Sequence, residues 1–258
     1  MSLFHTIRRL VLVSTILLPV RAGGQSVAER IALGDREQAA LNPTAALAHF
    51  EAALSVDSTN SEALGKASKC AVDIGEQLTD AAKRAESFRK GEQYARRAVA
   101  ASPNDPEAHF HLARALGRTA LTLGVRDRVR YAKDIRTQAL EALRLDPKHP
   151  GALHVMGVWN AEVMRLSGFE RFFAKNVLGG QVFSQANWKD AVSNMERAVA
   201  VDPERLTHRL DLGKIYLDVN EKSKAREQFE FVVRGRQTDV NDPLYKREAE
   251  AALRKLNK

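Results

Sequence analysis

One helical pattern recurs along this 258-residue chain and constrains its fold more than any other feature. Small residues, mostly alanine, stand at i, i+4 and i+7, and a Pro or Ser closes the segment. Because this spacing places small side chains along one side of a helix, a second helix can approach closely there. Four segments show the full pattern and a fifth lacks the closing Pro: residues 45–58, 91–103, 135–147, 191–203 and 225–233.

A partner helix accompanies each of these segments and carries a large residue followed by a small one. The pairs are Leu33-Gly34, Leu112-Ala113, Met156-Gly157 and Leu212-Gly213. Together with the closing Pro, they resemble the tetratricopeptide repeat. The resemblance implies an all-α, right-handed superhelix of about five helical hairpins.

The closing residues lie further apart than the roughly 34 residues of a standard repeat unit. We therefore expect extended insertions between the two helices of each unit, as longer helices or extra turns. The expected units are residues 27–60, 61–105, 106–149, 150–205 and 206–242, followed by a capping helix at 243–258. That last segment alternates charged residues with Ala and Leu, as the open end of a solenoid requires.

The first 22 residues have the features of a signal peptide. Arg8 and Arg9 precede an apolar run at residues 10–20, and Val20-Arg21-Ala22 resembles a cleavage site. We expect export to the periplasm or beyond the cell. The alternative is an uncleaved anchor that leaves the protein associated with a membrane. A bacterial lipid anchor is not expected, because no Cys follows the apolar run.

Charge and cysteine content narrow the function classes. The formal net charge is +8, and removal of the three arginines in the signal segment lowers it to +5. This mild excess falls short of the concentrated basic face of a nucleic-acid-binding protein, so no nucleic-acid partner is expected. Cys70 is the single cysteine, and its apolar surroundings indicate a buried structural thiol.

The sequence shows no pattern typical of an enzyme, a metal site or a cofactor site. His109 and His111 stand two positions apart, so they face different sides of a helix. The other histidines lack metalloprotease spacing: His49, His149, His154 and His208. No nucleophile elbow and no phosphate-binding glycine loop is present. A non-enzymatic protein without metal or cofactor is expected.

A stripe on the first helix of the third unit predicts a binding surface. Phe110, Arg114 and Arg118 lie at i, i+4 and i+8. Guanidinium groups in this position could bind carboxylates or phosphates. The alternative is a solvated face balanced by Asp127 and Asp134. Trp159 falls beside the stripe, and we expect it to pack on the preceding helix. The same face of later helices carries His154, Val158, Leu210 and Lys214.

Residues 169–178 predict a short amphipathic helix that the repeat does not need. Phe169, Phe172 and Phe173 fall on one side, and Arg171 and Lys175 fall on the other. Three roles remain open. The helix could pack on its own superhelix, cover an apolar cavity as a lid, or contact a membrane surface.

The second half of the chain resembles the regulator of microtubule dynamics family. The resemblance covers about residues 90–258 and rests on five stretches: Gly157-Val-Trp159, Phe169-Glu-Arg171 with Lys175, Asn187-Trp188 to Pro203, Asp211-Leu-Gly-Lys-Ile-Tyr216 and Asn241-Asp-Pro-Leu-Tyr-Lys-Arg-Glu-Ala-Glu-Ala251. It implies a non-enzymatic, tetratricopeptide-like protein. Eukaryotic members are associated with microtubules and organelle surfaces, whereas the export signal suggests a bacterial relative. The resemblance therefore carries over the fold and not the partner.

The sequence as a whole predicts an exported, non-enzymatic scaffold that binds a partner protein or peptide in its concave groove. The competing hypothesis is a lipid-binding or lipid-transfer module, with the Phe-rich segment as its lid and an anionic lipid as its ligand. The sequence leaves the oligomeric state open.

Overall fold

The computed structural model describes residues 25–167 and 181–257, and the regular elements of that part of the chain are helices, with no strand among them. The helices pair along the chain as α1 (Val27–Ala39) with α2 (Pro43–Val56), α3 (Ser61–Gln77) with α4 (Ala81–Ala101), α5 (Pro106–Ala120) with α6 (Val125–Leu145), α7 (Pro150–Arg165) with α9 (Trp188–Val201) and α10 (Leu206–Asp218) with α11 (Lys222–Arg234). A short 3-10 helix, η1 (Gln181–Gln185), precedes α9, and α12 (Asp242–Leu256) closes the chain.

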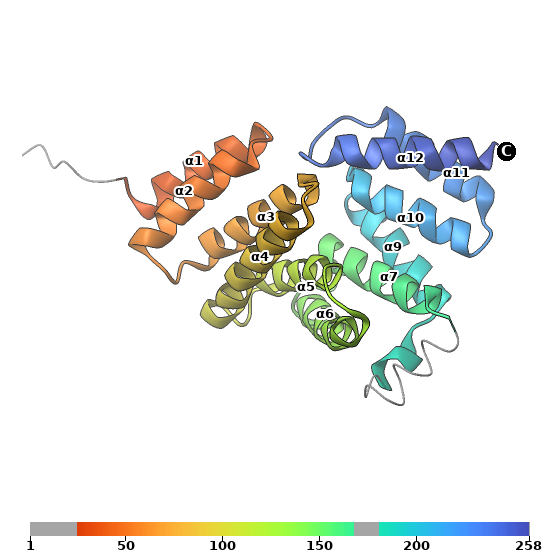
Figure 1. Ribbon diagram of the computed structural model, residues 1–258, viewed down its shortest axis with the longest axis horizontal. Helices are drawn as coiled ribbons and strands as arrows, with labels where there is room; N and C mark the ends of the chain where they lie inside the picture. Colours follow the sequence, from red (N-terminus) through yellow and green to blue (C-terminus); the bar gives the residue numbers. More distant parts are fainter. Residues whose placement is uncertain (1–24, 168–180, 258) are drawn as a thin grey trace, which may run out of the picture.

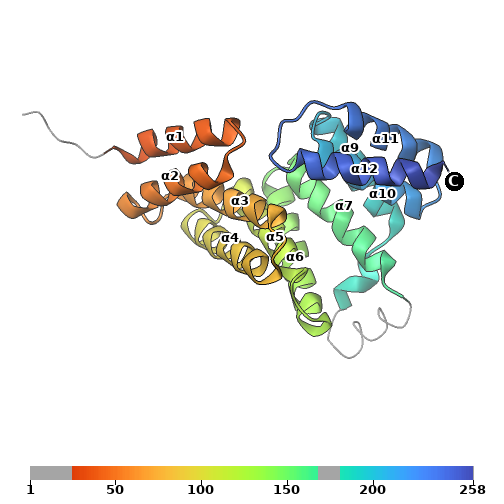
Figure 2. The same cartoon turned by 45° about the horizontal axis from the view of Figure 1, so that its top comes forward.

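The hairpins follow one another along an arc (Figures 1 and 2). The first helices of successive hairpins contact each other from α3 to α5, α5 to α7 and α7 to α10, so these helices form the inner, concave layer. The second helices form the outer layer. The expected all-α, tetratricopeptide-like superhelix is confirmed, and α12 packs on α10 and α11 at its C-terminal end.

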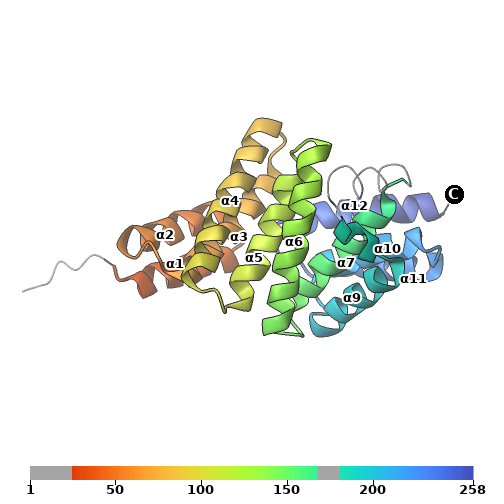
Figure 3. The ribbon, with the colours of Figure 1, turned by 90° about the horizontal axis from the view of Figure 1, so that it is seen from below.

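Added helical turns account for most of the extra length per unit. Both α4 and α6 have 21 residues, and short turns connect them to α3 and α5. Figure 3 shows α4, α5 and α6 in succession along the superhelix. In the fourth unit the extra length lies between α7 and α9 instead. The predicted helix at 169–178 falls in that interval, outside the described residues, as does the predicted signal segment at 1–22.

Capping residues determine where most of the helices begin. The side-chain oxygen of Asn60 accepts a hydrogen bond from the backbone N–H of Ala63 at 3.0 Å, and Asp80 caps α4 in the same way. Such a cap satisfies an otherwise unpaired N–H and stabilises the helix by about 1 kcal/mol. Three helices begin with a Pro, α2 at Pro43, α5 at Pro106 and α7 at Pro150, where the missing N–H has no cost.

The small-residue positions lie at the contacts between helices, as the sequence pattern predicts. The glycine of the Leu212-Gly213 pair packs against the ring of Phe229 on α11, and a Cβ there would lie 2.6 Å from the ring. Gly34 and Phe50 make the equivalent contact between α1 and α2. A glycine is therefore needed at these two positions because an aromatic ring occupies the space of a side chain.

Two further predictions from the sequence are confirmed in the core. Burial raises the pKa of the Cys70 thiol to about 12, and nearby Asp73 adds to the shift. Cys70 is therefore a structural thiol. Trp159 is buried, and its indole N–H donates a hydrogen bond of 2.7 Å to the carbonyl of Ala132 on the preceding helix α6.

Candidate functional site

The C-terminal part of the chain crosses the concave face and contacts α3. We call residues 238–245 the latch; they comprise the end of the α11–α12 loop and the first turn of α12. In Figure 1 this end of α12 points toward the C-terminal end of α3. The hydroxyl of Tyr245 donates a hydrogen bond of 2.8 Å to Glu76, and Lys69 Nζ lies 3.7 Å from Asp239. The latch thus connects the second hairpin to the last one.

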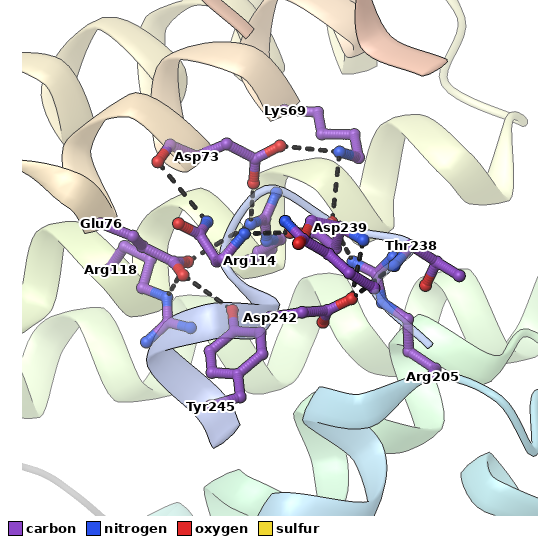
Figure 4. Close-up of polar contacts among 12 residues, drawn as sticks. Lys69, Asp73, Glu76, Arg114, Arg118, Arg205, Thr238, Asp239, Asp242 and Tyr245 are labelled. Carbon is purple, nitrogen blue, oxygen red and sulfur yellow. Dashed lines mark hydrogen bonds and ion pairs between the residues drawn. The ribbon is translucent and has the colours of Figure 1, made fainter. Parts of the chain in front are cut away.

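The surface that receives the latch is a network of charged side chains, shown in Figure 4. We call it the docking face; it consists of Lys69, Asp73 and Glu76 of α3, Arg114 and Arg118 of α5, and Arg205, which precedes α10. Four cations here face two carboxylates. Asp239 and Asp242 of the latch supply two more carboxylates, so the charges of the closed arrangement balance.

The ion pairs of the docking face are short and largely shielded from water. Arg114 Nη2 lies 2.5 Å from Asp73 Oδ1, which is 1% exposed, and 3.3 Å from Glu76. Arg118 Nε lies 2.8 Å from the same Glu76 oxygen. Burial of a charge costs free energy unless the charge has a partner of opposite sign. Because each α5 arginine finds its carboxylate partner on α3, the pairs hold these two helices together.

The latch residues are held in defined protonation states. Burial alone would raise the pKa of Asp239, but Arg205 at 2.8 Å, assisted by Lys69, outweighs it and lowers that pKa to about 2. Burial and the neighbouring Glu76 raise the pKa of Tyr245 well above its usual range. At neutral pH, Asp239 is therefore an anion among cations and Tyr245 is a hydrogen-bond donor.

The latch also has internal order. One carboxylate oxygen of Asp242 accepts hydrogen bonds from the backbone N–H groups of Thr238 and Asp239, at 2.8 and 2.7 Å. Asp239 in turn accepts one from the N–H of Asn241 at 3.0 Å. These bonds form a compact turn that presents the Asp239 carboxylate and the Tyr245 ring to the docking face.

Several residues of the predicted stripe lie in or next to this network. The guanidinium groups of Arg114 and Arg118 pair with Asp73 and Glu76 of α3, and not with Asp127 and Asp134 as in the alternative of a solvated face. The Phe110 ring contacts the rings of His111 and His149 at tilted angles, with centroid distances of 5.2 and 4.8 Å.

The later helices show a mixed outcome for the same stripe. Lys214 pairs with Asp211 at 3.1 Å and with Glu248 of α12 at 2.8 Å, and His154 lies 3.4 Å from Asp211. Val158 is half-buried. The prediction that Leu210 lines the groove is wrong: its side chain is 2% exposed, because it packs in the hydrophobic core that α10 shares with α9 and α11.

The predicted residues of the Phe-rich segment have no place in the described site. Phe169, Arg171, Phe172, Phe173 and Lys175 all lie outside the described residues. The three roles proposed for them remain predictions.

Sequence analysis missed the residues that complete the network, namely Lys69, Asp73, Glu76, Asp239 and Tyr245. A local signal existed for three of them. Lys69, Asp73 and Glu76 follow each other at i, i+4 and i+7, which places the three charges along one side of the helix. No local signal connects that strip to Asp239 or Tyr245.

A cleft of about 460 Å³ lies on the concave side between α1 and α3, beyond the latch. Its lining combines apolar side chains of α1 with polar residues of both helices: Val27, Ala28, Ile31, Ala32, Asp35, Asn60 and Glu62. The volume falls within the range of ordinary ligand pockets. The cleft is therefore an opening on the concave face that residues 25–167 and 181–257 leave uncovered.

Two other kinds of site are absent from the part of the chain that the structure describes. No group of three or more His, Cys, Asp or Glu side chains there is arranged to hold a metal ion. None of the helices in that part combines the length and the apolar character needed to cross a membrane.

Comparison with solved structures supports the fold. A thermophilic tetratricopeptide repeat protein of Thermus thermophilus superposes with a TM-score of 0.63 at 19% identity, covering 88% of this chain and all of that one. At this level of identity the likeness concerns the fold alone.

Comparison with known sequences identifies relatives. Regulator of microtubule dynamics protein 1 of Bos taurus is 27% identical over 172 residues, which are 66% of this chain and 53% of that protein. The Homo sapiens protein is 27% identical over 134 residues, which are 52% of this chain and 42% of the relative. The chain spans about half the length of the curated relatives it matches. The family model for Regulator of microtubule dynamics protein 1-3 matches residues 30–257, and the chain belongs to this family.

Proposed function

We infer that the protein is an exported, non-enzymatic scaffold that binds a segment of a partner protein on its concave face. The observation that carries this proposal is the uncovered cleft between α1 and α3. Stacked helical hairpins bury their contacts with one another and leave the curved inner surface as their extended binding surface. A cleft on that surface, with an apolar floor, is the natural place for a partner side chain to enter.

The cleft combines an apolar floor with a charged rim. Lys66 Nζ lies 2.5 Å from Asp35 and 3.1 Å from Glu62, so this one cation leaves a single net negative charge at the rim. Ile31 forms part of the floor, and Ala28 and Ala32 are exposed beside it. A partner helix or extended segment with an apolar anchor residue fits this arrangement. The apolar anchor would contribute most of the affinity, since fully desolvated contacts dominate such interfaces.

Export is part of the proposal and is supported by the first 22 residues. Arg8, Arg9 and the apolar run at 10–20 have the order and length of a secretory signal. We expect the protein purified from its native host to begin after Ala22. Intact-mass measurement tests this: a mass that still includes residues 1–22 would contradict cleavage and favour the membrane-associated form.

Site-specific photo-crosslinking tests the binding function. A crosslinking amino acid at Ala32, in the concave cleft, is expected to capture one defined protein from the native envelope fraction. The same amino acid at Ser193, which lines a cleft of about 350 Å³ beside α9, is the matched control and is expected to capture none. Ala28→Arg, which fills the cleft, should abolish the adduct at Ala32.

The outcome at these two positions decides between the proposals. Equal capture from Ala32 and Ser193, or no protein adduct at Ala32, would contradict the scaffold function. An acyl-chain adduct at Ala32, confirmed by native mass spectrometry of the folded protein, would replace it with the lipid-binding alternative.

A further inference from the structure

We propose that the latch is an intramolecular ligand of the docking face, and that an acidic, tyrosine-containing segment of a partner displaces it. The latch would then inhibit partner binding at the docking face. This inhibitory role rests on the proposed scaffold function, whereas the replacement of the latch by another segment of the same chemistry does not. Four features of the described residues support the proposal.

The first feature is the distance in sequence between the two sides. Tyr245 and Glu76 are 169 positions apart, and Asn241 donates a hydrogen bond of 3.5 Å to the Asp73 carbonyl across 168 positions. The latch therefore contacts the docking face in the way that a peptide segment of another protein would. The rest of the hairpin stack does not require this contact, because each hairpin packs on its neighbours independently.

The second feature is the polar character of the contact. The docking face offers an excess of two positive charges, and Asp239 of the latch pairs with Arg205 and Lys69. The second latch carboxylate, Asp242, adds negative charge nearby but accepts its hydrogen bonds from within the latch. By contrast, the apolar core around Tyr245 and Ala249 consists of residues of the last two hairpins and α12, without a contribution from α3. A contact made of buried ion pairs gains little net free energy, because desolvation offsets most of the Coulombic attraction. Such a contact can open and close.

The third feature is incomplete satisfaction of the latch. Asn241 is fully buried, yet its side-chain oxygen has no hydrogen-bond partner among the described residues. One carboxylate oxygen of Asp242 is likewise buried without a hydrogen-bond partner among the described residues. Each buried, unpaired acceptor costs free energy on the order of 1–3 kcal/mol. A competing segment that does not bury such unpaired acceptors would avoid this cost and would bind better than the latch does.

The fourth feature is the loop that carries the latch. It begins after Gly235, which ends α11, and lacks regular structure up to Asn241. Such a loop holds the latch at an effective concentration on the order of millimolar near the docking face. A partner segment must therefore bind the docking face more tightly than the latch does in order to overcome this tethering.

The closed latch defines the chemistry of the partner. Asp239 pairs with Arg205 and Lys69, and Tyr245 donates to Glu76, six residues later in the sequence. The partner segment is expected to carry a carboxylate and a tyrosine at a comparable spacing in a turn. The donor is essential, because a phenylalanine would leave the second oxygen of Glu76 without the hydrogen bond that Tyr245 supplies.

A peptide exchange experiment tests the proposal without knowledge of the partner. The probe is a fluorescent peptide with the sequence of residues 237–246, titrated with the full chain and followed by fluorescence anisotropy. The wild-type chain should bind it poorly, since its own latch occupies the docking face. The double variant Asp239→Asn, Tyr245→Phe should bind it about ten-fold or more tightly, because its own latch competes less well. A probe peptide with the same two substitutions should not bind either protein.

Amide hydrogen exchange on the same proteins shows whether the latch has opened. Exchange in residues 73–77 and 238–245 should be faster in the double variant than in the wild type. If exchange is faster but the peptide binds no more tightly, the docking face does not accept a segment in trans and the proposal is wrong. If exchange is unchanged, these contacts do not hold the latch, and the proposal is equally wrong. Should the double variant fail to fold, Tyr245→Phe alone is used with the same criteria.

These outcomes are separate from those of the crosslinking experiment. A failed exchange of the peptide leaves capture at Ala32 untouched, and a missing partner at Ala32 leaves the exchange result intact. The two proposals can therefore be rejected one at a time.

Discussion

The hydroxyl of Tyr245, in the first turn of the last helix, donates a hydrogen bond of 2.8 Å to the carboxylate of Glu76, near the end of the third helix. Glu76 also receives Arg118 at 2.8 Å. This one carboxylate therefore joins α3, α5 and α12. It lies where the second hairpin and the last helix of the superhelix approach each other.

Tyr245→Phe is expected to lower the free energy of unfolding by about 1–2 kcal/mol, because one hydrogen bond to a charged group is lost while the ring remains. Urea unfolding followed by circular dichroism measures this. Tyr216→Phe is the matched control, since Tyr216 donates a similar bond of 2.7 Å to Glu196 within the C-terminal hairpins. Only Tyr245→Phe should accelerate amide exchange in the last turn of α3. Faster exchange there in both variants would show that the effect is global.

Gly213→Ala is expected to destabilise the protein by about 1–3 kcal/mol, because the added methyl group would overlap the Phe229 ring. Gly117→Ala is the control. Gly117 also lies within a helix, but an added Cβ there would meet no atom within 4 Å. That variant should be stabilised by up to about 1 kcal/mol through helix propensity alone. Thermal unfolding of both variants checks the contrast, and equal effects would contradict the close packing of α10 on α11.

Acidification is expected to destabilise the protein partly through His154. Burial lowers the pKa of His154 to about 4, although the nearby Asp211 raises it somewhat. Between its unfolded value near pH 6.5 and pH 4, the unfolded chain binds a proton that the folded chain does not. The contribution of His154 to the free energy of unfolding is therefore fully present above pH 6.5. It falls as the pH drops toward 4, by about 3 kcal/mol at most.

His154→Gln should flatten this dependence. The free energy of unfolding, measured by urea titration at several pH values between 4 and 8, should fall less steeply with acidification in the variant than in the wild type. An identical slope for the two proteins would mean that His154 is protonated equally in the folded and unfolded chains.

The Cys70 thiol is expected to resist modification in the folded protein. Its side chain is fully buried and its pKa is raised to about 12, so the reactive thiolate is nearly absent at pH 8. Reaction with a thiol-specific disulfide reagent should be about 100-fold slower or more in the native protein than in urea. Comparable rates in the two conditions would contradict the burial of α3.

Local features of the sequence were sufficient to predict the hairpins. The positions of alanine and glycine indicate which helix faces meet, because only small residues allow the approach seen at Gly213 and Phe229. Caps such as Asn60 and Asp80, and prolines such as Pro106, determine where helices begin through bonds that span three residues. These interactions are short in range, so each can be recognised in a few consecutive residues.

The candidate site was only partly predictable. The spacing of Arg114 and Arg118 placed both on one face of α5, but it did not identify Asp73 and Glu76 of α3 as the residues that they contact. The spacing placed Leu210 on the same face, and the structure buries it. A small rotation of one helix about its axis exchanges a groove position for a core position, and sequence spacing does not resolve such a rotation.

The sequence by itself determined the repeat, the helix boundaries and the pairing of neighbouring helices in this protein. Tertiary structure alone decided that Asp239 and Tyr245 meet Lys69 and Glu76. The physical reason is that the meeting depends on the curvature of the whole superhelix. That curvature is the sum of small rotations between successive hairpins, and no short stretch of residues encodes the sum.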